Sequence, residues 1–423
     1  MTKITDIPAI RFKGFSDTWE QRKFGEVFDC TVPNNTLSRA ELSYDEGTVL
    51  NVHYGDVLIK YGSVLDVQKD DIPRIPHRCR EDFNGALLQD GDVIIADTAE
   101  DETTGKACEI GNLQGSAIVS GLHTMVCRPR NRMALGYLGY YLNSNAYHHQ
   151  LLPLMQGIKV LSLSRSNIQK TSVSYPSAMK EQQLIASYFS QLDHLITLHQ
   201  RKYDKLTNVK KSMLEKMFPQ NGSNVPEIRF KGFTEAWEQR KLGEIGSVSM
   251  CRRIFKEQTS ENGEIPFYKI GTFGGEADAF ISRELFEEYK AKYQYPKKGD
   301  ILISASGSIG RTVVFTGKNE YFQDSNIVWL NHDKHLDNSF LKCFYSIVKW
   351  AGIEGSTIKR LYNDNILNTA ITLPSVEEQQ KIGAYFENLD NLITLHQRKP
   401  VVVNSSSTMN ALPNQHLYFQ VLE

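Results

Sequence analysis

A seven-residue repeat of apolar side chains runs through the middle of the chain, after Ser177. Its main row is Ile185, Leu192, His199, Leu206 and Met213, and its companion row is Tyr188, Leu195, Lys202 and Val209. This period predicts one amphipathic helix of roughly 35–40 residues, which is about 50–60 Å long at about 1.5 Å per residue. The Phe218-Pro219-Gln220-Asn221-Gly222 segment ends the helix and is typical of a hinge.

The same row returns near the other end of the chain at Ile382, Leu389 and His396. A long amphipathic helix would expose its apolar stripe, so we expect these two helices to pack on each other. The matched histidines, His199 and His396, either fix the register of the pair or occupy ordinary packing positions.

Short runs of β-branched and aliphatic residues predict strands at residues 93–96 and 118–119, and again at 301–303 and 313–315. Helices are expected at 137–154 and 340–353. Each half therefore has strands first, then a helix, and then the long helix described above.

Two phrases of the sequence occur twice. The phrase from Ile7 to Glu26 returns from Val225 to Glu244, with Trp-Glu-Gln-Arg-Lys in both copies. The second phrase, Glu-Gln-Gln followed by Leu-Ile-Thr-Leu-His-Gln-Arg-Lys, spans residues 181–202 and returns at 378–399. The segments between the phrases have diverged. This pattern predicts two homologous halves, each opening and closing with the same element.

Composition sets broad limits on the class of protein. The 423 residues are 40% hydrophobic and 23% charged, which is typical of globular domains, and no apolar run approaches the length of a membrane span. Six cysteines without CxxC spacing argue against a zinc ribbon or a disulfide framework and favour a reducing cytoplasm.

The net charge of −1 by itself gives no indication of a nucleic-acid partner. Its distribution is more informative, because residues 128–170 contain basic residues and no acidic one, whereas 29–100 are predominantly acidic. The sequence thus permits a basic binding face behind a balanced total charge.

No motif in the sequence supports a reaction. Gly307 to Thr312 resembles the end of a phosphate-binding loop, but Arg311 replaces the required lysine, so a turn between strands is expected. His148 and His149 are adjacent and make a poor metal pair. Glu288-Tyr289-Lys290 lies in a charged run that predicts a solvated helix face.

Polar loops in matching places of the two halves are better candidates for binding. Gly157 to Ile168 aligns with Gly355 to Ile366, and both segments carry the side chains that base edges and phosphates require. Each single residue could equally belong to an ordinary soluble loop. The candidate DNA contacts are Lys159, Ser162, Ser164, Arg165, Asn167, Thr357, Lys359, Arg360, Tyr362 and Asn363.

With both repeats in view, the chain resembles the DNA-specificity subunit of type I restriction–modification systems. The residues that carry the resemblance are the opening from Gly14 to Glu26, its copy from Gly232 to Glu244, and the two Glu-Gln-Gln…Leu-Ile-Thr-Leu-His-Gln-Arg-Lys helices. The resemblance covers residues 7–399 and depends on constant phrases flanking divergent middles.

The resemblance implies a mixed α+β fold with a pseudo-twofold repeat, in which an antiparallel coiled coil separates two target-recognition domains. Each domain would read one half of a split sequence in double-stranded DNA. The partners implied are two modification (methyltransferase) subunits and the restriction–translocation subunits. S-adenosylmethionine, ATP and magnesium would belong to those partners, and this chain would bind no cofactor and no metal and would catalyse no reaction.

The domain boundaries follow from the repeats. The expected segments are a first recognition domain (1–177), a long helix (178–218), a hinge (219–228), a second recognition domain (229–375), a shortened second helix (376–399) and an atypical flexible tail (400–423).

The second helix departs from the first at Pro400, where an Asn/Ser-rich stretch replaces the helical sequence. We call the apolar rows through which the two long helices pack the seam. About half of the seam from Leu206 to Met217 is therefore expected to lack its partner within the chain. Two other functions remain open: a repeat-built protein-interaction scaffold without DNA binding, and a fused restriction enzyme. The target sequence and the spacer length cannot be read from the sequence.

Overall fold

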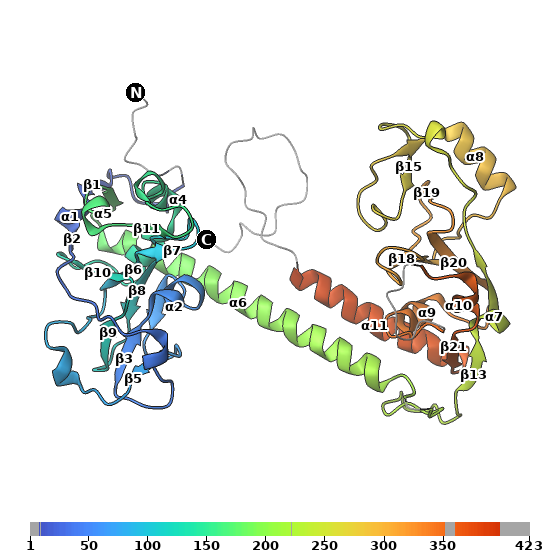
Figure 1. Ribbon diagram of the computed structural model, residues 1–423, viewed down its shortest axis with the longest axis horizontal. Coiled ribbons are helices and arrows are strands. Elements are labelled where there is room, and N and C mark those ends of the chain that lie inside the picture. The colour runs from blue at the N-terminus through green and yellow to red at the C-terminus, as the bar shows by residue number, and fades with distance from the viewer. Residues whose placement is uncertain (1–7, 9, 221, 352–359, 398–423) are drawn as a thin grey trace. The chain divides into compact units, whose positions relative to one another are not determined.

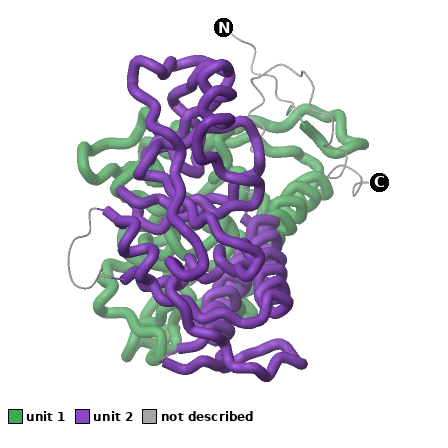
Figure 2. Tube along the Cα trace, turned by 90° about the vertical axis from the view of Figure 1, so that its right-hand side faces the viewer, with its two compact units in different colours: residues 1–197 green, residues 198–423 purple. Residues whose placement is uncertain are grey.

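The computed structural model describes residues 8, 10–220, 222–351 and 360–397 (Figure 1). The chain divides into two compact units, residues 1–197 and 198–423, with the division inside its longest helix (Figure 2). Each unit mixes helices with small sheets, as expected. The predicted tail at 400–423 lies outside the described residues. No helix in the described ranges is long and apolar enough to cross a membrane.

Unit 1 is built on a five-stranded sheet of order β2-β10-β6-β8-β4 and a three-stranded sheet of order β5-β3-β9. Two pairs, β1-β12 and β11-β7, complete it. The strands are β1 (Glu20–Lys23), β2 (Phe28–Asp29), β3 (Val49–Val52), β4 (Val64–Asp66), β5 (Arg74–Ile75), β6 (Val93–Ala96), β7 (Thr98–Ala99), β8 (Ala107–Gly111), β9 (Ala117–Ser120), β10 (Thr124–Pro129), β11 (Leu161–Ser162) and β12 (Ser172–Tyr175).

The central strand β6 shows why the predicted apolar run is a strand. Successive side chains of a strand point to opposite faces. Val93 and Ile95 accordingly join one hydrophobic cluster of unit 1, while Ile94 and Ala96 join another. Because both faces of the sheet are covered, the strand is apolar throughout instead of alternating.

Unit 2 repeats this arrangement with a four-stranded sheet of order β14-β20-β17-β18, a three-stranded sheet of order β16-β15-β19, and the pair β13-β21. In β17, Ile301 and Ile303 belong to one cluster and Leu302 to the other. The strands are β13 (Glu238–Lys241), β14 (Gly246–Ser249), β15 (Ile265–Tyr268), β16 (Phe280–Ile281), β17 (Ile301–Ser304), β18 (Thr312–Val314), β19 (Tyr321–Phe322), β20 (Ile327–His332) and β21 (Ala370–Leu373).

The helices confirm the long amphipathic elements and correct the shorter ones. Residues 137–154 do not form one helix, because the backbone turns out of helical geometry at Ser144 (ψ 152°). The second predicted helix, 340–353, is also shorter in the structure. The helices are α1 (Phe24–Val27), α2 (Tyr54–Ile59), α3 (Tyr137–Asn143), α4 (Asn145–His148), α5 (Arg165–Ile168), α6 (Met179–Lys216), α7 (Leu242–Ile245), α8 (Arg283–Lys292), α9 (Asn338–Tyr345), α10 (Asn363–Leu367) and α11 (Val376–Gln397).

Within unit 2, α11 lies beside the C-terminal part of α6. Nδ1 of His199 lies 2.9 Å from Nδ1 of His396, and Lys210 forms an ion pair with Asp390. Lys210 follows His199 along α6, whereas its partner Asp390 precedes His396 along α11. The two segments therefore run antiparallel. The matched histidines predicted for the seam thus face each other directly.

This pairing corrects the expectation that half of the seam from Leu206 to Met217 lacks a partner. Leu214 and Met217 are buried (8% and 4% exposed) in the same cluster as Phe386 and Leu389 of α11. Antiparallel pairing around His199 places the C-terminal half of α6 opposite residues of α11 that precede Pro400. The buried half of the seam is therefore the one predicted to be unpaired.

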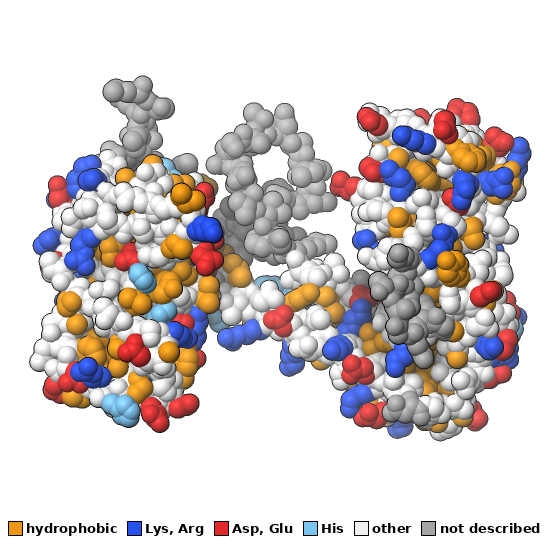
Figure 3. Space-filling view, viewed as in Figure 1, with side chains coloured by type: hydrophobic (Ala, Val, Ile, Leu, Met, Phe, Trp, Pro, Cys, Tyr) orange, Lys and Arg blue, Asp and Glu red, His pale blue; other side chains and the backbone are white. Residues whose placement is uncertain are grey.

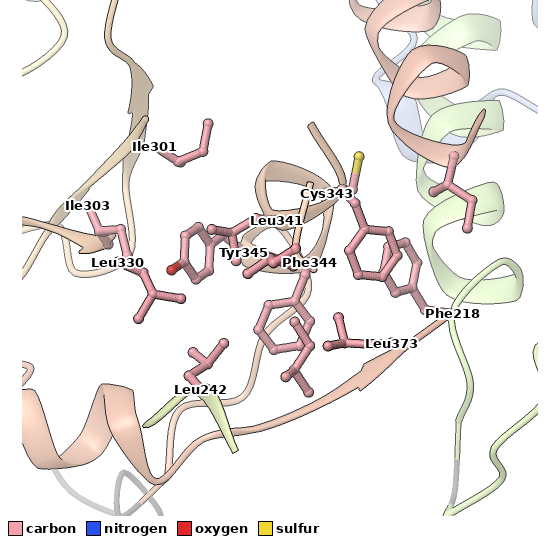
Figure 4. Packing of buried hydrophobic residues seen from close by; sticks show 14 of the residues in the cluster. Phe218, Leu242, Ile301, Ile303, Leu330, Leu341, Cys343, Phe344, Tyr345 and Leu373 are labelled. Carbon is pink, nitrogen blue, oxygen red and sulfur yellow. The ribbon is translucent and has the colours of Figure 1, made fainter. Parts of the chain in front are cut away.

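The core of unit 2 also holds the residue that follows α6. Phe218 is 4% exposed and stacks on Phe340 at a centroid distance of 5.2 Å, and it meets the indole of Trp237 edge-on. Figure 4 shows Phe218 at the edge of this cluster, on the side where Cys343 and Leu373 lie. The end of the long helix is thereby anchored to the second unit.

Candidate nucleic-acid interface

The candidate loop of unit 1 is a hairpin that leads into a short helix. Gln156 and Ser162 exchange two backbone hydrogen bonds of 3.0 and 2.8 Å. The returning strand β11 pairs with β7, so that Leu161 lies opposite Ala99. Two segments more than 50 positions apart in sequence thus form one structural unit.

After the hairpin, the chain is fixed by a buried side chain and two polar ones. Leu163 is buried and its N–H donates to the carbonyl of Asp97 at 2.8 Å. The hydroxyl of Ser164 caps α5 by accepting from the N–H of Asn167 at 3.2 Å. The amide of Asn167 donates to the carbonyl of Leu154 at 3.4 Å.

Unit 2 fixes its matching loop in the same way. Ser306 and Arg360 form an isolated antiparallel bridge, and the N–H of Leu361 donates to the carbonyl of Ala305 at 2.7 Å. The amide of Asn365 donates to the carbonyl of Ala351 at 2.9 Å. Two of the candidate residues, Thr357 and Lys359, lie outside the described residues.

The alignment of the two loops separates the residues that hold the loop from those that face solvent. Leu163 matches Leu361, Asn167 matches Asn365 and Ile168 matches Ile366, and these identical residues are buried or bonded to the protein itself. The unmatched positions are mostly exposed. They are Ser162, Ser164, Arg165 and Ser166 in unit 1, and Arg360, Tyr362, Asn363 and Asp364 in unit 2.

The candidate residues fall into two groups, which differ in whether their side chains are exposed and could contact DNA. Lys159, Ser162, Arg165 and Asn363 are exposed, and Tyr362 is 64% exposed. The hydroxyl of Ser162 also donates to the carbonyl of Gln156 at 3.3 Å, and the remaining described candidates bond to the protein as well. Ser164 caps α5, Asn167 bonds to Leu154, and Nη2 of Arg360 donates to the carbonyl of Ser325 at 2.9 Å.

In unit 2 the exposed candidates surround a small hollow. A pocket of about 330 Å³ is lined by Met250, Ser325 and the run from Arg360 to Asp364. Ser325 has a positive φ of 55°, a conformation that is uncommon for residues other than glycine. The guanidinium of Arg360 holds this turn in place and so shapes one wall of the pocket.

Sequence reasoning missed the loops that lie beside the candidates. In unit 1 this is the segment after β6, where Asp97 and Thr98 contact the hairpin. In unit 2 it is the β17–β18 connection around Ser306. Residues 307–311 of the predicted turn connect these two strands, and Thr312 is already the first residue of β18. The sequence did contain a signal for both loops. Each loop follows a strand that begins just after a Gly-Asp dipeptide, at 91–92 in unit 1 and at 299–300 in unit 2.

The charge of this surface is mixed and not uniformly basic. Arg128 forms two hydrogen bonds to the buried carboxylate of Asp92, and this contact raises the pKa of the guanidinium. Acidic residues 100–102 lie in the loop next to the hairpin, and Nε2 of His148 lies 2.8 Å from the carbonyl of Glu102. In Figure 3, Lys and Arg side chains are interspersed with Asp and Glu over the visible face of each unit. Within residues 128–170, the charge of Arg128 is thus balanced by Asp92, whereas Lys159 and Arg165 are exposed.

The residues considered for a metal site or a reaction make contacts within the protein. Nδ1 of His149 lies 2.7 Å from the carbonyl of Asn145, so the two adjacent histidines face different carbonyls. Glu288 pairs with Lys292 on the exposed face of α8. Among the described residues, no group of three or more His, Cys, Asp and Glu side chains is arranged to hold a metal ion.

Comparison with known families decides the affiliation. The family model described as "Type I restriction modification DNA specificity domain" matches residues 16–208 and 234–405, one segment in each half. The chain belongs to the type I restriction–modification DNA-specificity family. The resemblance read from the repeated phrases is thereby confirmed, and so are the duplication and the DNA-recognition class of the protein.

Relatives in this DNA-specificity family cover different parts of the chain. A protein of Haemophilus influenzae, "Putative type I restriction enzyme specificity subunit S.HindORF215P", is 60% identical over 158 residues, which are 36% of this chain and 41% of that protein. The chain thus matches less than half of the length of that relative. A protein of Methanocaldococcus jannaschii, "Putative type I restriction enzyme MjaX specificity subunit", is 22% identical over 421 residues, covering 94% and 91% of the two chains.

The fold of the DNA-specificity family is recognisable as well. The crystal structure of the type I restriction–modification S subunit from M. genitalium matches with a TM-score of 0.57 at 13% identity, covering 93% of each chain. At this identity the likeness shows the fold alone. It confirms the mixed architecture with two domains and a long helix.

Proposed function

We propose that the chain reads a bipartite DNA sequence for a type I restriction–modification complex, with one half-site read by each unit. The observation that carries this proposal is the contrast between the two aligned loops. Identical residues hold both loops, and exposed unlike residues occupy the same places on them. A frame that is kept while its exposed side chains change is what two readers of different sequences require.

The exposed side chains suit base and phosphate contacts. Arginine recognises guanine through two parallel hydrogen bonds, and asparagine recognises adenine in the same way. Arg165 at the start of α5 and Asn363 at the start of α10 occupy matching places in the two units. We infer that this exchange of side chains gives the half-sites different base preferences.

Tyr362 and Lys159 have more general roles in this proposal. The exposed ring of Tyr362 offers a hydroxyl beside the pocket of unit 2, and Lys159 offers a flexible cation at the hairpin of unit 1. Phosphate contacts of this kind position a protein on DNA without carrying sequence information. Thr357 and Lys359 remain candidates for the same role.

The partners and cofactors follow from the same proposal. Two modification subunits and the restriction–translocation subunits would supply the reactions, with S-adenosylmethionine, ATP and magnesium bound to them. The chain itself would be non-catalytic and would act in the cytoplasm, a setting that suits its six cysteines, all of them free thiols.

Methylation sequencing of DNA from a host carrying this chain and its modification subunit tests the proposal. We expect methylation at one bipartite sequence. Exchange of residues 29–175 for those of a relative should change one half-site and leave the other intact. Methylation that is independent of sequence, or a change in both half-sites, would contradict the assignment of one half-site to each unit.

Single substitutions refine that test. Arg165→Ala should relax base preference in one half-site and Asn363→Ala in the other. Arg22→Ala, which removes an exposed arginine from the constant frame, should leave both half-sites unchanged. If the complex shows no salt-dependent binding to DNA, a protein-interaction scaffold is the better interpretation of this chain.

A further inference from the structure

The tip of the hairpin in unit 1 presents aliphatic side chains to solvent. Ile158 is 100% exposed and Val160 is 51% exposed, and Lys159 stands between them. Folding of a chain in water normally buries β-branched aliphatic residues. A single exposed aliphatic residue is common on protein surfaces, but here two of them flank one lysine at the tip of a candidate binding loop, so they form a small apolar feature that DNA could contact.

The hairpin is built so that the tip stays outside. Gly157 has a φ of 125°, and a Cβ at this position would lie 1.9 Å from the carbonyl oxygen of Val160. Only glycine fits there. The paired backbone bonds between Gln156 and Ser162 close the turn behind it, and β11 is in turn paired with β7. The tip is thus supported on its protein side.

The chemistry of the DNA grooves narrows what this tip can contact, given the proposed function on which the inference rests. A two-stranded ribbon fits the major groove, which is about 12 Å wide. Base edges in that groove present donors and acceptors, with the 5-methyl group of thymine as their apolar feature. Polar edges would lose hydrogen bonds to water against an aliphatic side chain, whereas a methyl group would gain from the contact.

We propose that Ile158 reads thymine in the half-site of unit 1 by packing against its 5-methyl group. Val160 supports the contact from the neighbouring position, and Lys159 lies between them within reach of the phosphates that flank the groove. In the aligned loop of unit 2 the residue matching Ile158 is Ser356. The methyl contact therefore belongs to one half-site only and adds to the asymmetry of the target.

The experiment uses the full chain assembled with its modification subunits and a duplex carrying the target site found by methylation sequencing. Each thymine of the half-site read by unit 1 is replaced in turn by uracil, which lacks the 5-methyl group. At one position we expect binding to weaken about fourfold, the loss that corresponds to one buried methyl group. The Ile158→Ser variant should bind the thymine duplex about tenfold more weakly and should show no further loss on uracil.

A matched control comes from the same unit. Ile59, at the end of α2, is 88% exposed and lies outside the candidate loops, so Ile59→Ser should leave both the affinity and the uracil penalty unchanged. The inference is overturned if Ile158→Ser retains the full uracil penalty, or if no thymine of this half-site shows one. In either case sequence-specific binding by the unaltered chain would still support the proposed function, and its absence would instead defeat that function.

Discussion

Arg11 and Glu181 lie 170 positions apart in sequence, and Nε and Nη2 of the arginine donate to the two carboxylate oxygens at 2.6 and 2.8 Å. Their side chains are 11% and 1% exposed. Unit 2 contains the same contact between Arg229 and Glu378, at 2.7 and 2.8 Å. The first repeated phrase is thus joined to the start of the second one in each half, which gives a physical reason for the two phrases to recur together.

Loss of this contact should destabilise the unit that contains it. Glu181→Gln leaves the largely buried guanidinium of Arg11 without its counter-charge, and breaking a buried pair in this way is strongly destabilising. We expect the melting temperature of unit 1 to fall by roughly 5–10 °C. Glu20→Gln is the control, because Glu20 pairs with Arg22 at the surface (39% and 54% exposed) and should leave melting unchanged. Equal effects of the two substitutions would argue against a structural role for the Arg11 contact.

Two matched leucines on the long helices test how the seam is covered. Leu389 of α11 is 7% exposed, whereas the leucine at the matching place of α6, Leu192, is 36% exposed. Leu389→Ala should therefore lower the free energy of unfolding by about 2–5 kcal/mol, as is usual for buried leucines. Leu192→Ala should cost less than about 1 kcal/mol. Denaturant unfolding of the two variants measures the difference, and similar losses would mean that both halves of the seam are covered in solution.

Much of the frame could be predicted from local pattern. The heptads of α6 and the apolar runs of β6 and β17 have periods that the backbone itself imposes, so their extents agree with expectation within a few residues. The helix expected at 137–154 is interrupted at its middle, where side chains make one long-range and one local hydrogen bond to backbone carbonyls. The side chain of Asn143 donates to the carbonyl of Ala107 at 2.7 Å, and the hydroxyl of Ser144 donates to the carbonyl of Tyr141 at 2.6 Å.

Only part of the candidate interface could be predicted from the sequence. Alignment of the repeats found the loops around Arg165 and Asn363, because each half provides a copy for comparison. It could not find the loops packed beside them, since pairing of Leu161 with Ala99 or of Arg360 with Ser306 connects distant segments. Nor could it show that Ser164, Asn167 and Arg360 bond to the protein, which depends on the folded backbone.

The histidine pair of the seam should respond to pH. Partial burial and the nearby charge of Lys202 lower the pKa of His396, and His199 adds to this effect. Because folded His396 binds the proton less readily than unfolded His396, its contribution to stability is present above the ordinary histidine pKa of about 6.5 and is lost as pH falls below it. An NMR titration should give a pKa for His396 below that value, and His199→Ala should raise it. An unaltered pKa in this variant would show that the two rings do not interact in solution.

Glu109 of β8 provides the clearest pH dependence in unit 1. Its carboxylate is 1% exposed and accepts from the N–H of Gly139 at 2.8 Å, and it lines a groove of about 1150 Å³. Burial raises its pKa to about 7, against the opposing effect of the backbone N–H groups at the start of α3. Between the ordinary glutamate pKa and about 7, the folded state therefore holds a proton that the unfolded state has released.

The sign of the effect follows from this difference in bound protons. Stability falls as pH rises wherever the folded state binds more protons, so unit 1 should lose on the order of 3 kcal/mol between about pH 4.5 and 7 through this group. Glu109→Gln should remove that loss, because glutamine carries no charge at any pH. Melting temperatures of the two proteins at pH 5 and pH 8 measure this loss. Subtracting the values of one protein from those of the other cancels the effects of the remaining titrating groups. A stability difference that is independent of pH would mean that the carboxylate is ionised in the folded protein throughout this range.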